Sequence, residues 1–111
     1  MGLDQYWHVE GESEEFYYHR KVPALEAFMS AKWKSIPGNE DGVFNCEKLI
    51  VTEEILNELE IKVKNKTLDN HATGFFWGTH YDEDYDDMQE AINKAREKIN
   101  SGNTVTYSSW W

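Results

Sequence analysis

Residues 81–99 read YDEDYDDMQEAINKAREKI, and this stretch contributes most to the prediction of the fold. Its apolar side chains recur at intervals of four, three, four, three and four residues, at Tyr81, Tyr85, Met88, Ile92, Ala95 and Ile99. These intervals place them on one face of an α-helix. Acidic residues come early in the stretch and basic residues late, as the helix dipole favours. We therefore expect an amphipathic helix over about residues 84–100.

Two further helices are expected earlier in the chain. Pro23 suits a first helical turn, because its missing N–H has no helical partner there, and apolar residues recur at helical spacing over residues 23–34. Thr52 is a good N-cap, and the acids that follow it complement the positive end of the helix dipole. The second helix is therefore expected over residues 52–64.

Runs rich in aromatic and β-branched residues predict short strands around these helices. The runs cover residues 3–10, 48–51, 75–77 and 104–107. Residues 16–19 are either a further strand or an extended lead into the first helix. The order of elements predicts one α+β domain over residues 1–111, with three helices packed on a small, mainly antiparallel sheet of three to four strands. The order of the strands in the sheet stays open.

Composition limits the class of protein. The chain has 111 residues, of which 14% are aromatic, and this share argues against disorder because disordered chains contain few aromatic residues. Its net charge of -10 repels nucleic-acid phosphates and anionic lipids, so direct nucleic-acid binding and membrane binding are not expected. The charge either serves solubility alone, attracts a basic partner or mimics a nucleic acid.

Cysteine content and hydrophobicity bear on location. Cys46 is the one cysteine, so no internal disulfide can form, which is consistent with a reducing cytoplasm. No apolar stretch approaches the ~20 residues that span a bilayer. The first residues lack the basic and hydrophobic regions of a secretory signal. We expect a cytoplasmic protein.

Aromatic residues of the second half form the first candidate site. The predicted aromatic patch consists of Phe75, Trp77, Tyr81, Tyr107, Trp110 and Trp111. The competing interpretation is that these aromatic side chains pack in the core, as is expected above all for Phe76 and Tyr85. Because a strand alternates faces, one residue of each adjacent aromatic pair is expected near the surface. Surface Trp and Tyr side chains are common anchors of protein interfaces, and the Trp110-Trp111 pair can equally seal a homodimer.

Charged residues form two further candidate sites. His19, Arg20 and Lys21 make a basic cluster that can hold a phosphate or carboxylate, or else a solvated turn. The acidic face comprises Asp82, Glu83, Asp84, Asp86 and Asp87. It lacks the Gly at position six and the Glu at position twelve of a calcium loop, so no metal is expected. No cofactor and no catalytic motif are predicted, and Cys46 reads as a small hydrophobic residue rather than a nucleophile.

Several segments resemble a family of small, mostly uncharacterised proteins encoded by bacteriophages and prophages. The Met-Gly-Leu-Asp-Gln-Tyr start is similar to the start of that family, and Gly74-Phe75-Phe76-Trp77-Gly78 is similar to its Gly-Phe-Phe-Phe-Gly motif. Tyr81-Asp82-Glu83 with Tyr85 resembles its Tyr-Asp-Glu-Tyr-Tyr segment, and Ser108-Ser109-Trp110 resembles its end. His19 stands where the family has Trp. The resemblance implies a phage accessory protein in the host cytoplasm.

The residues and the resemblance together suggest a non-enzymatic protein that binds a host protein and inhibits or redirects it, in host takeover or anti-defence. The alternative is a small-ligand or nucleotide-binding protein, in which aromatic side chains stack on a base and Arg20 and Lys21 hold phosphate. A third reading, a small hydrolase that uses the clustered acids and a metal, depends on the metal site that the sequence does not support.

Overall fold

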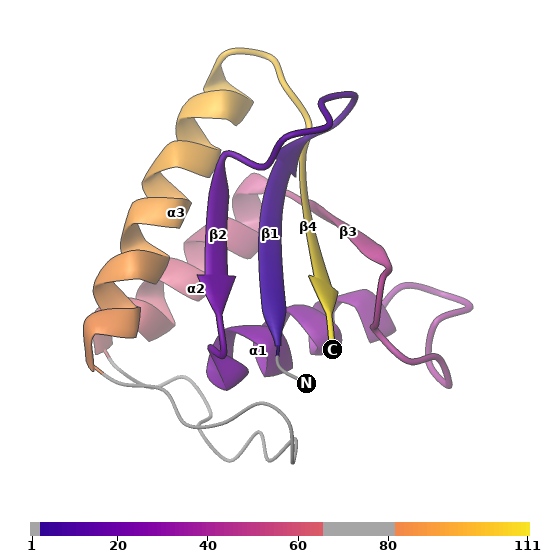
Figure 1. Ribbon diagram of the computed structural model, residues 1–111. Coiled ribbons are helices and arrows are strands. Elements are labelled where there is room, and N and C mark those ends of the chain that lie inside the picture. Colours follow the sequence, from indigo (N-terminus) through magenta and orange to yellow (C-terminus); the bar gives the residue numbers. More distant parts are fainter. Residues whose placement is uncertain (1–2, 66–81) are drawn as a thin grey trace.

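The computed structural model describes residues 3–65 and 82–111, with only the backbone described for residues 82–84. Within these ranges, the chain forms four strands and three helices, shown in Figure 1. In chain order they are β1 (Asp4–Val9), β2 (Tyr17–Arg20), α1 (Pro23–Lys34), β3 (Lys48–Val51), α2 (Glu53–Asn65), α3 (Asp82–Asn100) and β4 (Val105–Trp110). The predicted α+β fold is confirmed. The strand predicted over residues 75–77 lies outside the described residues.

The four strands form one sheet in the order β2-β1-β4-β3. Every pairing in the sheet is antiparallel. β4 comes last in the sequence, yet it lies between β1 and β3, so β2 and β3 are the outermost of the described strands (Figure 1). Of residues 16–19, which the sequence left open, residues 17–19 belong to strand β2 and Phe16 precedes it.

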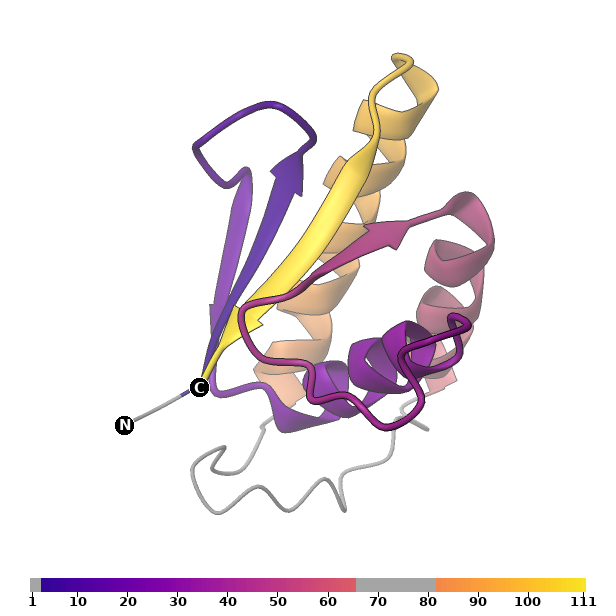
Figure 2. The ribbon, with the colours of Figure 1, turned by 90° about the vertical axis from the view of Figure 1, so that its right-hand side faces the viewer.

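All three helices lie on one side of the sheet, as Figure 2 shows. The side chains of β1 alternate accordingly: Gln5, Trp7 and Val9 are buried toward the helices, as is Leu3 just before the strand. The sheet therefore has an inner face, covered by the helices, and an outer face that no described helix covers. None of the described helices is long and apolar enough to cross a bilayer.

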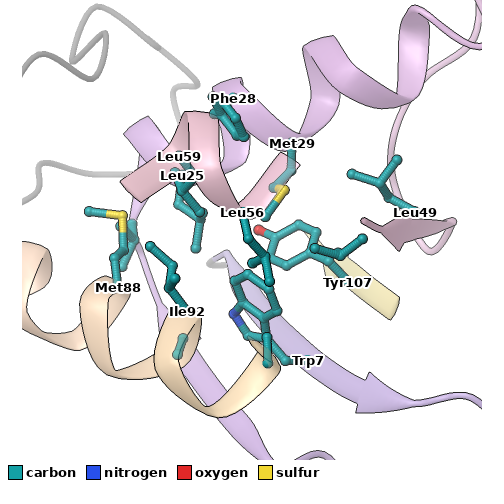
Figure 3. Close-up of a cluster of buried hydrophobic side chains, with 14 of the residues drawn as sticks. Trp7, Leu25, Phe28, Met29, Leu49, Leu56, Leu59, Met88, Ile92 and Tyr107 are labelled. Atoms are coloured by element: carbon teal, nitrogen blue, oxygen red, sulfur yellow. The ribbon is translucent and has the colours of Figure 1, made fainter. Parts of the chain in front are cut away.

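The core fills the space between the inner face and the helices (Figure 3). Trp7 and Tyr107 meet edge to face with ring centroids 5.5 Å apart, and Phe44 stacks on Tyr107 at 5.9 Å. The predicted face of α3 is confirmed: Met88, Ile92 and Ala95 are fully buried, and Tyr85 is buried as well. Ile99 packs against the core but is only partly buried.

Local signals explain where the helices begin. Pro23 is the first residue of α1, and the helix has the bounds that the sequence predicts. The Thr52 hydroxyl accepts a hydrogen bond from the Ile55 N–H at 3.3 Å, so Thr52 caps α2. α3 begins at Asp82, two residues before the predicted start.

Candidate functional site on the open face of the sheet

The strand register places the outward-facing side chains in three rows across the sheet. Adjacent strands lie about 4.8 Å apart, so neighbours within a row are in contact distance of one another. We call this surface the open face. Its rows are Arg20, Asp4 and Trp110; then Tyr18, Tyr6, Ser108 and Lys48; then His8, Thr106 and Ile50, of which Thr106 is buried among its neighbours.

Aromatic rings form a continuous strip on the open face. The Tyr6 ring lies 5.4 Å from that of Tyr18 and 6.2 Å from that of His8, measured between centroids. The Tyr18 hydroxyl donates a hydrogen bond to the Asp4 carboxylate. This bond, with partial burial, raises the pKa of Tyr18 to about 12. Tyr18 therefore stays neutral, and its ring is held in place over the sheet.

Trp110 is the most exposed large apolar side chain on this face, with 66% of its surface accessible. The backbone beneath it is fixed by the next residue. The Trp111 N–H donates to Asn45 Oδ1 at 3.1 Å, the Asn45 side-chain amide donates to the Trp111 carbonyl at 2.7 Å, and the Trp111 indole N–H donates to the Phe44 carbonyl at 2.9 Å. Trp111 is an anchor and Trp110 is presented to solvent.

Tyr107 does not belong to this surface, and its assignment to the aromatic patch is wrong. Its register partner on β1 is Trp7, so it faces the helices and is fully buried. Its hydroxyl donates to Glu26 at 2.8 Å and accepts from the Gln5 side-chain amide at 2.9 Å. The hydroxyl thus serves a buried polar network rather than a partner.

The predicted basic cluster is divided by the strand alternation. His19 faces the core, where it accepts a hydrogen bond from the Trp7 indole N–H at 2.9 Å. Burial lowers the pKa of His19 to about 4, so the ring is neutral at pH 7 and its assignment to a cationic cluster is wrong. Arg20 is exposed in the first row of the open face. Lys21 follows the strand with a φ of 57° and is exposed.

The remaining predicted residues lie elsewhere. Phe75, Trp77 and Tyr81 are outside the described residues. Asp82, Glu83 and Asp84 form the first turn of α3, and their side chains are outside the described part. Asp86 and Asp87 are exposed on α3. Asp87, together with Glu90, accepts hydrogen bonds from the Tyr17 hydroxyl at 3.3 and 3.2 Å, so part of the acidic face ties α3 to β2.

Of the residues on the open face, only Arg20 and Trp110 were predicted as site residues; the aromatic and apolar members that were missed are Tyr6, His8, Tyr18 and Ile50. In residues 3–10 the polar Gln5 points inward and the aromatic Tyr6 outward, so hydrophobicity alone assigns the faces of this strand poorly. Ile50 lies in an apolar run, which suggests a core residue, but 59% of its surface is exposed. If Trp7 is assigned to the core, strand alternation places its two neighbours, Tyr6 and His8, on the outer face.

The chemistry of this surface suits recognition. It combines aromatic rings and an exposed Ile with the charges of Asp4, Arg20 and Lys48. No family model, curated protein or solved structure matches the chain. In the part of the chain that the structure describes, no three His, Cys, Asp or Glu side chains converge where a metal ion could bind.

Proposed function

We propose that this chain is a non-enzymatic binding protein that inhibits or redirects a host protein, and that the open face is its contact surface. The observation that carries the proposal is Trp110, which is largely exposed on a strand whose next residue is fixed by three hydrogen bonds. Because the backbone beneath Trp110 is already fixed, only the side chain loses conformational freedom when a partner covers it. Trp and Tyr at such positions supply much of the affinity of protein interfaces.

The charge of the chain supports a basic partner. A net charge of -10 attracts a positively charged protein over a longer range than the contacts themselves and speeds its association. The resemblance to phage-encoded proteins supports a host protein as that partner. The aromatic strip of Tyr18, Tyr6 and His8 extends the contact from Trp110 toward β2 and gives it the width of the sheet.

A nucleotide is the second candidate ligand, because Arg20 and Trp110 lie in the same row of the open face. A base stacked on Trp110 would place its phosphate toward Arg20, about 10 Å away across two strand spacings. Asp4 stands between the two side chains, and its carboxylate repels a phosphate at that position. The geometry therefore favours a protein over a nucleotide.

The test compares Trp110→Ala with Ile61→Ala in affinity capture from host lysate, followed by affinity measurement with the purified partner. Ile61 is a matched control because it is 62% exposed but lies on α2, in the helical layer. We expect a stoichiometric partner that wild type and Ile61→Ala retain and Trp110→Ala loses. Thermal denaturation of each variant checks that the fold is intact.

Two outcomes would contradict the proposal. Equal capture by all three proteins would show that the open face is not the contact surface. Capture of no stoichiometric partner by the wild type would reject the binding of a host protein. The nucleotide candidate is then judged by quenching of Trp fluorescence across a nucleotide panel, with Arg20→Ala as the variant expected to lose it.

A further inference from the structure

The edge strand β3 turns backbone hydrogen-bonding groups away from the sheet. On the neighbouring strand, the Thr104 carbonyl accepts from the Glu10 N–H at 2.8 Å, on the β1 side, and the Ser109 carbonyl accepts from the Cys46 N–H at 2.7 Å, on the β3 side. Because consecutive residues of a strand point their N–H and C=O groups to opposite sides, Val105 and Tyr107 bond toward β3.

The register then identifies which backbone groups of β3 point away from β4. Val51 and Leu49 stand opposite Val105 and Tyr107, so their backbone groups are directed into the sheet. Lys48 and Ile50 alternate with them and direct their N–H and C=O groups outward. Both residues are exposed, and no described strand pairs with this edge. The outward groups are spaced to match one further extended strand.

A hollow of about 470 Å³ lies beside this edge, between the end of α1, strand β3 and the start of α2. In Figure 2 these three segments face the viewer. Its apolar lining includes Ile36, Leu49 and Ile55, and its carboxylates are Glu54 and Glu58. A strand added to β3 would send every second side chain toward this hollow, as the existing strands send theirs to the core.

We propose that the outer edge of β3, with which no described strand pairs, binds one extended, basic segment of a partner protein, which adds to the sheet as a further strand. Its backbone pairs with Lys48 and Ile50, and alternate apolar side chains enter the hollow over Leu49 and Ile55. A basic side chain of the segment forms an ion pair with the Glu54 carboxylate. This site is separate from Trp110 and does not rest on the function proposed for the open face.

Charge decides between a partner segment and a second copy of the chain. Glu58 is already paired with Lys32, whereas Glu54 forms no ion pair with any residue that the structure describes. Glu47, Glu54 and Glu58 outnumber Lys32 and Lys48 around the edge, and each copy carries a net charge of -10. Two copies would repel one another at this edge, while a basic strand would be attracted.

The test uses a capped peptide of alternating Val and Lys as the probe, with hydrogen exchange of the protein amides measured by NMR. We expect the Lys48 and Ile50 amides to exchange at least about tenfold more slowly when the peptide is saturating, as newly bonded amides do. Two N-methylated peptides are compared, one methylated on every Val and the other on every Lys. Because each set of amides lies on one side of the strand, one version should lose binding and the other keep it.

Protein variants locate the bound peptide. Glu54→Gln should weaken binding about two- to fivefold, the range for an exposed charge pair, while Trp110→Ala should leave it unchanged. No binding, full binding by both N-methylated peptides, or loss of binding in Trp110→Ala would each overturn the proposal. Protection of Lys48 and Ile50 that rises with protein concentration in the absence of peptide would also overturn it, since the occupant would then be a second copy.

Discussion

The Tyr107 hydroxyl donates a hydrogen bond to the carboxyl group of Glu26 at 2.8 Å, in the middle of the core. Ser109 donates a second bond to the same carboxyl at 2.7 Å. Helix α1 is thereby bonded to the central strand β4. The Gln5 side chain extends the network: its amide donates to the Tyr107 hydroxyl and to the Val22 carbonyl. A fully buried carboxyl is costly without such donors, so the network fixes how α1 sits on the sheet.

Replacing Glu26 should separate the effect of its charge from that of its hydrogen bonds. Glu26→Ala leaves the hydroxyls of Tyr107 and Ser109 without their acceptor, and should lower the free energy of unfolding by about 2–4 kcal/mol. Glu26→Gln keeps an acceptor and should cost much less. Urea denaturation of the three proteins measures both values, and equal losses in the two variants would contradict the role of the acceptor.

The stability difference between wild type and Glu26→Gln should also depend on pH. Burial raises the pKa of Glu26 above its usual value of 4.5, although the bonds from Ser109 and Tyr107 oppose the shift. Between pH 4.5 and the raised pKa of the native state, Glu26 holds a proton that the unfolded state releases. The wild type therefore loses stability as the pH rises through this window. Denaturation curves at several pH values above 4.5 should show this loss for wild type and not for Glu26→Gln.

His19 should make the protein less stable as the pH falls, which is the opposite of the pH dependence expected for Glu26. Burial lowers the pKa of His19 from 6.5 to about 4, so below pH 6.5 the unfolded state binds a proton that the native state does not. The contribution of His19 to stability is fully present above pH 6.5 and should fall by up to about 3 kcal/mol as the pH drops toward 4. His19→Gln keeps an acceptor for the Trp7 indole and cannot titrate. An identical acid profile for the variant and wild type would show that another group is responsible.

Arg96 should account for much of the polar contact between α3 and α2. Its Nη1 lies 3.1 Å from Glu60 Oε2, its Nε lies 3.3 Å from Glu53 Oε1, and its Nη2 donates to Asn57 Oδ1 at 2.7 Å. The single nitrogen of a lysine cannot reach acceptors that Arg96 contacts with three separate nitrogens, so Arg96→Lys should lower stability by about 1 kcal/mol. Lys94→Ala is the control, because Lys94 contacts no residue of α2: its ammonium pairs with Glu90 within α3 and lies 5.4 Å from the centroid of the Tyr17 ring. It should change stability by less than about 1 kcal/mol.

Gly42 should not tolerate a methyl group. A Cβ atom there would lie 2.6 Å from Cη2 of the buried Trp33 ring, which also contacts Phe44. Gly42→Ala should therefore cost about 1–3 kcal/mol by overpacking. In a Trp33→Phe background the obstructing atoms are gone, so the same change should cost little. Additive losses in the double variant would place the cause in the backbone of residue 42 rather than in this contact.

The helices and the fold class were predictable because their signals are local. The period of α3 and the cap at Thr52 are each read within a few residues, and the structure confirms both. The open face was not predictable, because it depends on which strands pair and in which register. Tyr107 and Trp110 lie in the same strand, and only the pairing with Trp7 and Asp4 shows that the first is buried and the second exposed. His19 is a further case, since its neighbours Arg20 and Lys21 suggest solvent and its register places it in the core.

The central place of β4 determines when the sheet can be completed during synthesis. β1 and β2 are close in sequence and can pair as soon as both have left the ribosome, but among the described strands β3 pairs only with β4. Until residues 105–110 emerge, Leu49 and Trp7 lack their shared neighbour Tyr107, and the two halves of the sheet have no connection. Such long-range pairing slows folding. A nascent or prematurely terminated chain therefore presents two unpaired strand edges and an uncovered core, which are the features that chaperones and proteases recognise.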